Sequence, residues 1–204
     1  MYRISEYPQL IAHRGYSGPY PENTRVAIEA AMRLGVDMVE VDVRITRDGV
    51  PVLLHNVTLD ETTNGRGRVD AHRFDELHGY DAGAWKGPEF RGERLLSLRE
   101  TFLMTRDRMP LNLDIKTPAA IAPVIALIQE FGMLDQVVLS GCNWRCVRRV
   151  WHIDPRVRVL LNGHGYTEAM LRFLWARCAF FLTMCQDRVR PAFGVNVSHR
   201  YVGY

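Results

Sequence analysis

Short apolar runs alternate along the chain with longer segments in which apolar residues recur at helical spacing. Residues 37–45 alternate between apolar and polar positions and give the clearest strand pattern. Other runs with the length and composition of strands are 9–12, 50–54, 111–115, 136–139, 157–161 and 193–197. Helical patterns fall between most of these runs, at 24–34, 97–105, 118–131, 144–151 and 167–178. This alternation predicts an α/β protein whose parallel sheet is covered by helices and is either open or closed into a barrel.

The segment 57–94 interrupts this pattern, because Gly, Asp, Thr and Arg replace the apolar periodicity. A loop of this length inside a compact domain is usually functional. No linker or low-complexity segment divides the chain, and its 204 residues, 47% hydrophobic and 24% charged, are typical of a globular protein. The sequence therefore predicts one domain over residues 1–204 with a long active-site loop around 57–94.

Charge and targeting patterns argue against several other classes of protein. The net charge is +3, but the basic residues are spread along the chain and do not form a nucleic-acid-binding tail. No run approaches the ~18 consecutive apolar residues of a membrane span, and residues 1–10 lack the apolar core of a signal peptide. We therefore expect a cytoplasmic protein without a nucleic-acid partner and without stable membrane insertion.

The cysteines also favour a reducing compartment. They contain no Cys-x-x-Cys pair and lie at Cys142, Cys146, Cys178 and Cys185. A Cys-x-x-x-Cys spacing can bring two thiolates together on a helix, but no histidine pattern accompanies it, which argues against zinc. We expect buried free thiols.

Polar side chains gather where the first four predicted strands end: His13, Arg14, Glu40, Asp42, His55, Asp114 and Lys116. Because strand side chains alternate between two faces, Glu40 and Asp42 share one face of their strand. The same spacing puts Asp114 and Lys116 on one face of theirs. Functional residues of β/α architectures lie at the carboxyl ends of the strands. We therefore expect these side chains to meet at one end of the sheet.

The types of residue in this set point to phosphoester chemistry. Two carboxylates on one strand face repel each other and raise each other's pKa unless a cation lies between them, and oxygen donors without cysteine suit Mg²⁺ or Ca²⁺. Arginine and lysine neutralise phosphate, and two histidines can act as general acid and base. Each residue alone is more often structural. Their coincidence favours metal-assisted phosphoester chemistry.

Several motifs with specific spacing carry a family resemblance: His13-Arg14-Gly15, Pro21-Glu22-Asn23-Thr24, Glu40-Val-Asp42-Val-Arg44, Val52-Leu-Leu-His55, Leu59-Asp-Glu-Thr62-Thr63 and Leu111-Asn-Leu-Asp114-Ile-Lys116. Over about its first 120 residues the chain resembles the glycerophosphodiester phosphodiesterase family. The resemblance implies a (β/α)₈ TIM barrel. It also implies hydrolysis of a glycerophosphodiester to glycerol 3-phosphate and an alcohol.

The resemblance also implies roles for individual residues. His13 and His55 would form the acid–base pair, and which of them is the acid stays open. The ligands of a divalent cation, Mg²⁺ or Ca²⁺, would be Glu40, Asp42 and Asp114. Arg14 and Lys116 would bind the substrate phosphate. Glu22 and Asn56 would support these groups from outside the reacting set, with Glu22 organising the loop after the first strand.

The chain departs from the family pattern at three positions. Asn56 replaces an aspartate after the second histidine, so it keeps the shape but loses the charge that would make His55 more basic. Glu61 replaces an arginine before the Thr-Thr pair and reverses a charge in the long loop. Asp114 replaces a longer glutamate, so a water molecule could bridge it to the cation.

Two other functions compete with this reading. A phospholipase-type enzyme acting on a larger lipid ranks lower, because no amphipathic or aromatic membrane-docking stretch stands out. A degenerate barrel that binds a phosphorylated ligand without turnover is the other alternative. Length bears on it, because a (β/α)₈ barrel typically has ~250 residues. The last predicted strand, 193–197, leaves the final helix–strand unit missing and an open edge that a homo-oligomer could cover.

Overall fold

One sheet organises the part of the chain that the structure describes. In the computed structural model, which describes residues 10–162 and 194–196, seven strands pair in the order β1-β2-β4-β5-β6-β7, with β3 beside β2. The strands are β1 (Ile11–His13), β2 (Met38–Ile45), β3 (Pro51–Leu53), β4 (Leu111–Ile115), β5 (Val137–Cys142), β6 (Arg158–Asn162) and β7 (Gly194–Asn196). Pairing along the main path is parallel, as the sequence predicts. Within the described residues β1 and β7 each have one neighbour, so the sheet there is an open arc.

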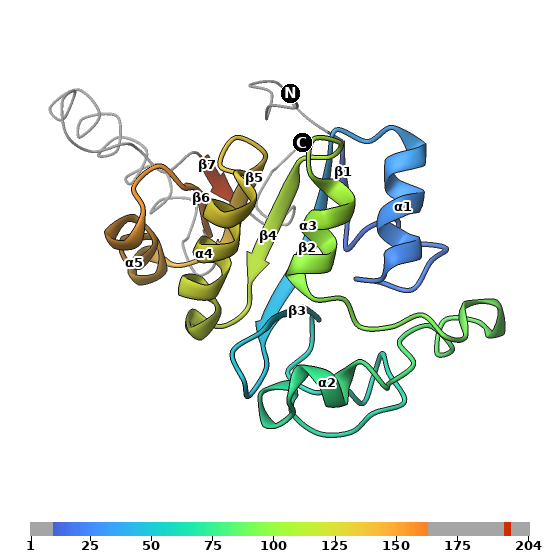
Figure 1. Cartoon of the computed structure of the whole chain (residues 1–204). Helices are drawn as coiled ribbons and strands as arrows, with labels where there is room; N and C mark the ends of the chain where they lie inside the picture. The colour runs from blue at the N-terminus through green and yellow to red at the C-terminus, as the bar shows by residue number, and fades with distance from the viewer. Residues whose placement is uncertain (1–9, 163–193, 197–204) are drawn as a thin grey trace, which may run out of the picture.

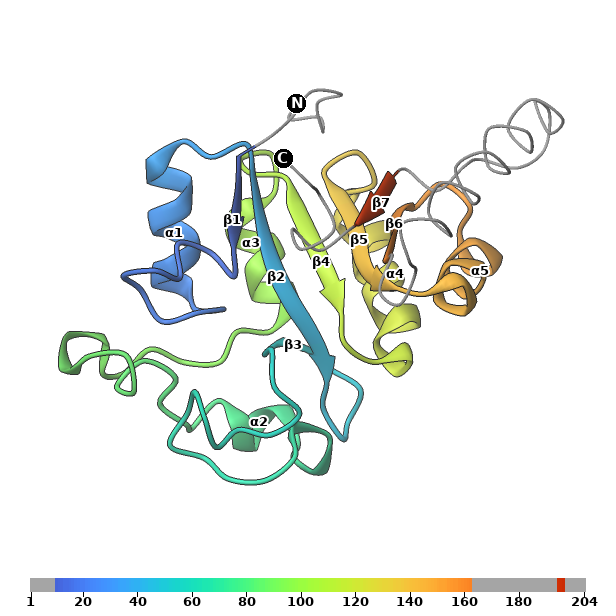
Figure 2. The same ribbon diagram turned by 180° about the vertical axis from the view of Figure 1, so that it is seen from behind.

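Helices cover one face of this sheet. They are α1 (Arg25–Leu34), α3 (Leu98–Thr105), α4 (Ile121–Phe131) and α5 (Trp144–Ile153), with the single-turn α2 (Phe74–Leu77) at one end of the sheet (Figure 1). Figure 2 shows β2 and β4 from the opposite side, in front of α3 and α4. The predicted helices between residues 24 and 151 are confirmed, and the one at 167–178 lies outside the described residues. Among the described helices, none has the length and apolar character needed to cross a membrane.

The third predicted strand runs in the opposite direction to its neighbours. β3 pairs antiparallel with the end of β2, with Val43 beside Leu53. The turn at residues 46–50 is too short for the crossover that parallel strands require, and Gly49 supplies the positive φ of 80° in that turn.

The position of His55 therefore needs a correction. The third predicted strand was expected to end at the same end of the sheet as the other three, but β3 runs antiparallel to β2. β3 instead returns along β2, so that the backbone amide of Leu54 donates a 3.1 Å hydrogen bond to the carbonyl of Asp42. His55 reaches the carboxyl end of the sheet by this return path.

Helix boundaries follow local signals in the sequence. α3 begins at Ser97, whose hydroxyl accepts a 3.2 Å hydrogen bond from the Glu100 amide, while the Glu100 carboxylate accepts one of 2.8 Å from the Ser97 amide. This reciprocal capping box satisfies two amides that a helix start leaves free. α1 ends at Gly35, which takes the left-handed φ of 76° that a helix end of this type needs.

The main core lies between the sheet and its helices. The outward-facing residues of β2 and β4, for example Val41 and Leu113, are apolar and fully buried beneath the helices, where Phe102 of α3 belongs to the same cluster. The opposite face of the same strands carries the polar residues, including Glu40 and Asp42. The apolar residues of the alternating segment 37–45 therefore face the core, and its carboxylates face the opposite side of the sheet.

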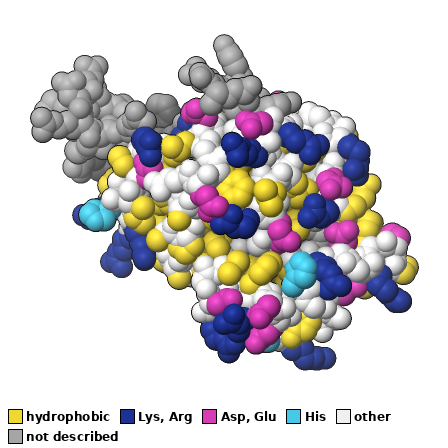
Figure 3. Space-filling model, in the orientation of Figure 1, with side chains coloured by type: hydrophobic (Ala, Val, Ile, Leu, Met, Phe, Trp, Pro, Cys, Tyr) yellow, Lys and Arg dark blue, Asp and Glu magenta, His cyan; other side chains and the backbone are white. Residues whose placement is uncertain are grey.

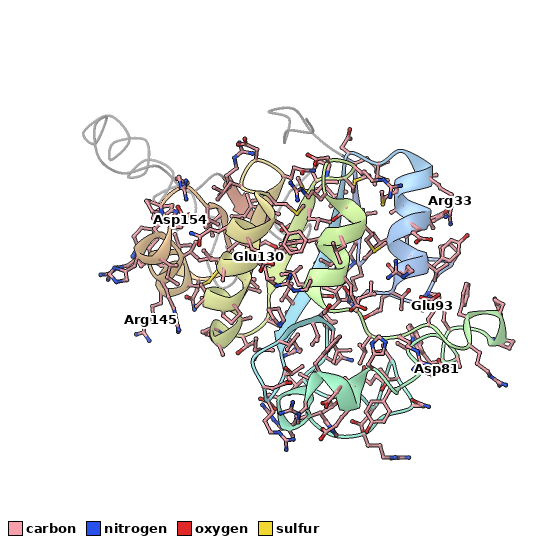
Figure 4. The ribbon with its side chains drawn as sticks, viewed as in Figure 1. Arg33, Asp81, Glu93, Glu130, Arg145 and Asp154 are labelled. Atoms are coloured by element: carbon pink, nitrogen blue, oxygen red, sulfur yellow. A yellow bond between two sulfur atoms is a disulfide. The ribbon has the colours of Figure 1, made fainter. Side chains whose placement is uncertain are left out.

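The segment 57–94 is more ordered than a plain loop. It packs around a second apolar cluster that includes Leu59, Val69 and Leu77. Asp81 accepts hydrogen bonds from the amides of Ala84 at 2.8 Å and Gly92 at 2.6 Å. Asp81 and Glu93 mark this segment in Figure 4. The segment lies at the end of the sheet where β2 meets β3 (Figure 1).

The expectation of free thiols is wrong for one pair of cysteines. Cys142 and Cys146 form a disulfide, with their Cα atoms 5.1 Å apart. Cys142 ends β5, and Asn143 caps α5 by accepting a hydrogen bond from the Cys146 amide. This turn from strand to helix brings the two side chains face to face, which sequence spacing alone does not reveal. Cys178 and Cys185 lie outside the described residues.

Removing the Ser97 hydroxyl tests how much the capping box stabilises α3. We expect Ser97→Ala to lower the free energy of unfolding by about 1 kcal/mol, because the Glu100 amide loses its acceptor. Ser97→Asp keeps an acceptor and should lose less. Urea unfolding followed by circular dichroism measures both, and equal stability of Ser97→Ala and the native protein would contradict the assigned cap.

Candidate active site

Side chains from three neighbouring strands converge at one end of the sheet. The β1–β2 register pairs His13 with Glu40, and the β2–β4 register pairs Asp42 with Asp114. Residues paired across parallel strands point to the same face. One carboxylate oxygen from each of Glu40, Asp42 and Asp114 lies within 4.8 Å of the other two. The structure thus brings together the three carboxylates that the sequence singled out.

This carboxylate cluster has the dimensions of a divalent cation site. Two oxygens on opposite sides of Ca²⁺ are about 4.6–5.2 Å apart, and around Mg²⁺ they are about 4.0–4.2 Å apart. Since 4.8 Å lies near this upper limit for two ligands of one ion, the three side chains would close in around a bound cation, more for Mg²⁺ than for Ca²⁺. The shorter side chain of Asp114 reaches the cluster directly. An all-oxygen donor set is also the one that these hard cations prefer.

Glu40 binds a proton far more tightly than an ordinary glutamate. Its side chain is 8% exposed, and Oε2 accepts a 2.8 Å hydrogen bond from the Arg14 amide. Desolvation, reinforced by the negative charge of Asp42, raises the pKa of Glu40 to about 8. The predicted elevation of pKa by carboxylate crowding is therefore found at Glu40.

Asp42 behaves in the opposite way, because it has strong donors. Its Oδ2 accepts a 2.8 Å hydrogen bond from the Asn23 side chain, and its Oδ1 lies 2.9 Å from the Lys116 ammonium. Burial alone would raise the pKa of Asp42, but these two donors outweigh burial and lower it. We expected each of the two carboxylates to raise the pKa of the other when no cation lies between them. The pKa of Asp42 is instead lowered.

Asn23 contacts the carboxylate cluster, although the sequence analysis assigned it no role in the predicted site. Its amide group donates to Asp42 Oδ2 and accepts a 3.1 Å hydrogen bond from the Asp42 amide, while Thr24 takes the cap position of α1. Asn23 has a left-handed φ of 58° and is buried. The available signal was its place in the Pro21–Thr24 motif of the resemblance.

Lys116 bridges two of the three carboxylates. Its ammonium lies 2.9 Å from Asp42 Oδ1 and 2.8 Å from Asp114 Oδ2. Burial would lower the pKa of Lys116, but its hydrogen bonds to Asp114 and Asp42 raise it, so the side chain stays cationic. The Lys116 ammonium thus lies between Asp42 and Asp114, two of the three residues that the resemblance assigns to the cation.

Arg14 supplies the second positive charge of the site. Its guanidinium donates to both carboxylate oxygens of Glu22, at 3.0 and 3.1 Å, and its Nε lies 3.3 Å from Asp42 Oδ2. Arg14 takes a left-handed φ of 58°, which turns the chain sharply after β1. Glu22 therefore holds the arginine side chain within the β1–α1 loop.

The two histidines occupy different surroundings. His13 is 68% exposed and its Nε2 lies 3.8 Å from Glu40 Oε2. Desolvation and the nearby charge of Arg14 lower the pKa of His13, which favours the neutral ring. His55 Nδ1 lies 2.6 Å from Asn56 Oδ1, and the His55 carbonyl accepts hydrogen bonds from the Arg44 guanidinium at 2.9 and 2.6 Å. The Asn56 contact thus holds the second histidine ring through Nδ1.

Two further residues adjoin the cluster and were missed from the sequence. Asn112 pairs with Glu40 in the β2–β4 register, is 7% exposed and has a side-chain oxygen without a hydrogen-bond partner. Gly141, in the irregular part of β5, lies so close to Asp114 that a Cβ atom there would collide with the Asp114 carboxylate. The polar residue inside an apolar strand was the available signal for Asn112. A glycine in a strand offers a weaker one for Gly141.

Comparison with known sequences shows which protein family this chain resembles. The model of the "Glycerophosphoryl diester phosphodiesterase family" matches residues 13–171. The chain is 37% identical to a glycerophosphodiester phosphodiesterase of Caldanaerobacter subterraneus subsp. tengcongensis, over 78% of this chain and 68% of that protein. It is 42% identical to a probable glycerophosphodiester phosphodiesterase 1 of Mycobacterium tuberculosis, over 78% of this chain and 66% of that protein. The chain thus spans about two thirds of the length of these relatives.

Solved structures agree on the fold. A glycerophosphodiester phosphodiesterase from Agrobacterium tumefaciens matches with a TM-score of 0.72 at 23% identity, covering 94% of this chain and 96% of that one. A phosphodiesterase from Oleispira antarctica, solved with its product sn-glycerol-3-phosphate, matches with a TM-score of 0.81 at 28% identity, covering 96% and 77%. The α/β sheet is thus part of a TIM-type barrel, which confirms the predicted fold class. Matched in sequence over residues 13–171 and in fold over most of its length, the chain belongs to the glycerophosphoryl diester phosphodiesterase family.

Proposed function

We propose that this protein hydrolyses glycerophosphodiesters to glycerol 3-phosphate and an alcohol with the help of a divalent cation. The observation that carries this proposal is the convergence of three carboxylates with Lys116 and Arg14 at one end of the sheet. Membership of the family supports it, as does the product complex of the Oleispira antarctica relative. One negative phosphodiester and one divalent cation are the partners that such a mixed cluster of charges would accept.

The cation would be held by Glu40, Asp42 and Asp114. When bound, Mg²⁺ or Ca²⁺ would polarise a phosphoryl oxygen and stabilise the negative charge that develops there. Lys116 would no longer be needed as the counter-charge of Asp42 and Asp114. Its ammonium, together with the Arg14 guanidinium, would then be available to the phosphate oxygens.

The two histidines would divide the proton transfers between them. His13 lies at the cluster and favours its neutral form, which suits the acceptance of a proton from the attacking hydroxyl. Asn56 Oδ1 accepts a hydrogen bond from His55 Nδ1, so Nε2 would face the reaction, and the ring protonated at both nitrogens would donate its Nε2 proton to the leaving alkoxide. The attacking hydroxyl belongs either to water or to the neighbouring glycerol carbon of the substrate.

The cytoplasmic location and the homo-oligomer expected from the sequence remain predictions.

Hydrolysis of glycerophosphocholine tests the proposed function. We expect release of glycerol 3-phosphate with added Mg²⁺ or Ca²⁺ and its loss in EDTA. Removal of the general base in His13→Ala should lower kcat by about 100- to 10,000-fold. Glu40→Ala should lower it by at least about 100-fold, because the cation loses a ligand.

The matched control is His78→Ala, because His78 is exposed and lies in the 57–94 segment. This variant should keep native activity. If the folded native protein releases no glycerol 3-phosphate with either cation, the proposed reaction is wrong. If it binds glycerol 3-phosphate without turnover, the protein is a degenerate barrel.

The pKa of Glu40 predicts a pH-dependent affinity for the cation. Without a cation this pKa is about 8, so binding below pH 8 must displace a proton from Glu40. The affinity for Ca²⁺ should therefore fall about tenfold per pH unit from pH 8 to pH 6 and level off above pH 8. Asp42 has a lowered pKa and stays ionised over this range.

Titration calorimetry with Ca²⁺ at a series of pH values measures this dependence. Glu40→Gln removes the titrating group, so it should bind more weakly and with a flat profile between pH 6 and pH 8. A native protein whose affinity does not change over that range would contradict the assignment of Glu40 as a ligand.

Gly141 predicts a steric effect on the same site. In Gly141→Ala the new methyl group would meet the Asp114 carboxylate and the backbone of Ile115, at a residue with a positive φ of 74°. We expect affinity for Ca²⁺ to fall at least about tenfold as Asp114 is displaced. Gly79→Ala is the control, because its methyl group would make an ordinary 3.5 Å contact. Equal affinities of the two variants would show that Gly141 does not position Asp114.

A further inference from the structure

Helix α5 carries a stripe of positive charge on one face. Arg145, Arg148, Arg149 and His152 follow the spacing i, i+3, i+4 and i+7, which places them side by side on a helix. All four are exposed, whereas Val147 and Val150 are buried against the rest of the protein. Figure 3 shows basic side chains gathered over α5, and Figure 4 shows Arg145 pointing away from the fold. We call these four residues the α5 stripe.

The α5 stripe has no acidic counterpart in the described part of the chain. No carboxylate of the described residues lies within 4.0 Å of Arg145, Arg148 or Arg149, and α5 contains no Asp or Glu. Most exposed arginines elsewhere in the described residues face a carboxylate: Arg33 faces Glu29 on α1, and Arg99 of α3 bonds Glu130 of α4 at 2.6 Å.

This lack of balance matters energetically. Like charges at i, i+3 and i+4 destabilise a helix, so the α5 stripe costs stability unless an anionic surface lies opposite to it. The arginine-rich composition of the chain accounts for the residue type but not for the absence of partners, since most other exposed arginines have them.

Aromatic side chains flank the stripe. Trp144 is 52% exposed, and its ring packs edge-on against Trp151 with centroids 6.3 Å apart. Ile153 adds a further apolar side chain that is 41% exposed. Tryptophan is enriched where a protein meets the headgroup region of a bilayer, because its ring is apolar with one polar edge. A nucleic acid would use the arginines but would gain little from an exposed isoleucine.

We propose that the α5 stripe and Trp144 form a peripheral docking surface for an anionic phospholipid bilayer. A basic helix with an aromatic border, held flat against the fold by Val147 and Val150, presents the chemistry that such a surface binds. Because α5 follows β5, its first turn with Trp144 lies at the carboxyl end of the sheet, the end that carries the candidate active site. Docking would thus bring that site close to lipid. The inference does not depend on the proposed hydrolysis.

Vesicle co-sedimentation of the full chain tests the proposal. We expect binding to phosphatidylglycerol–phosphatidylcholine vesicles at low salt, weaker binding at high salt, and none to pure phosphatidylcholine. Each arginine near such a surface contributes about a factor of five to binding. The triple variant Arg145→Gln, Arg148→Gln, Arg149→Gln should therefore bind about 100-fold more weakly. Trp144→Ala should also weaken binding.

The matched control replaces Arg25, Arg33 and Arg68 with glutamine. It changes the formal net charge from +3 by the same amount, but each of these arginines faces a carboxylate. The control should keep vesicle binding. Both triple variants should keep native turnover of a soluble glycerophosphodiester, because neither set touches the candidate active site.

Three results would overturn the proposal. One is the absence of native binding to the anionic vesicles, and another is an equal loss in both triple variants, which would mean that net charge alone acts. The third is tighter binding to a short DNA duplex than to the vesicles through the same arginines, measured by fluorescence anisotropy. Failure of glycerophosphocholine hydrolysis alone would refute the proposed function and leave the docking surface standing.

Discussion

One constraint governs the end of the sheet that carries the candidate active site. It is the repulsion between three carboxylates that are held close together. The β2–β4 register fixes Asp42 beside Asp114, and Glu40 follows from the same strand face. The carboxylates cannot move apart, because the apolar residues on the other face of β2 and β4 pack in the core and hold these strands in place. The Asn23 amide, the Lys116 ammonium and the Arg14 guanidinium are the polar neighbours that balance this negative charge.

Different means of balance act at each carboxylate. Glu40 retains a proton, Asp42 takes the Asn23 amide and the Lys116 ammonium, and Asp114 shares that ammonium. A divalent cation would replace the proton and the ammonium together. This exchange would free Lys116 for a phosphodiester and couple substrate binding to cation binding. The left-handed turns at Arg14 and Asn23 are the backbone conformations that bring their groups to the cluster.

The sequence predicted those elements whose ends and faces depend on residues that are close together in the chain. The alternation of 37–45 predicts β2 because one face of that strand is core and the other is site. Ser97 and Gly35 predict helix ends because capping depends on neighbouring residues alone. The carboxylate cluster was also predictable, since side chains at the ends of neighbouring parallel strands lie close together.

Features that depend on tertiary structure were not predictable in this way. The apolar pattern does not show the direction of β3, and the short turn at residues 46–50 was the signal in the sequence that could have given it. Asn23 and Gly141 act on residues that are distant in the sequence. Asn23 contacts Asp42, and Gly141 leaves room for Asp114. The Cys142–Cys146 disulfide needs the strand-to-helix turn between the two cysteines. The α5 stripe emerges once the buried residues Val147 and Val150 fix which helix face is outward.

The most direct test of the central claim is a crystal structure of the protein grown or soaked with Mn²⁺, with anomalous diffraction used to locate the ion. Mn²⁺ accepts the same oxygen ligands as Mg²⁺ and Ca²⁺ and gives a measurable anomalous signal. We predict one strong peak within bonding distance of oxygens from Glu40, Asp42 and Asp114, with the Lys116 ammonium moved off their shared centre. A map without a peak there, in which Lys116 still bridges Asp42 and Asp114, would contradict the account.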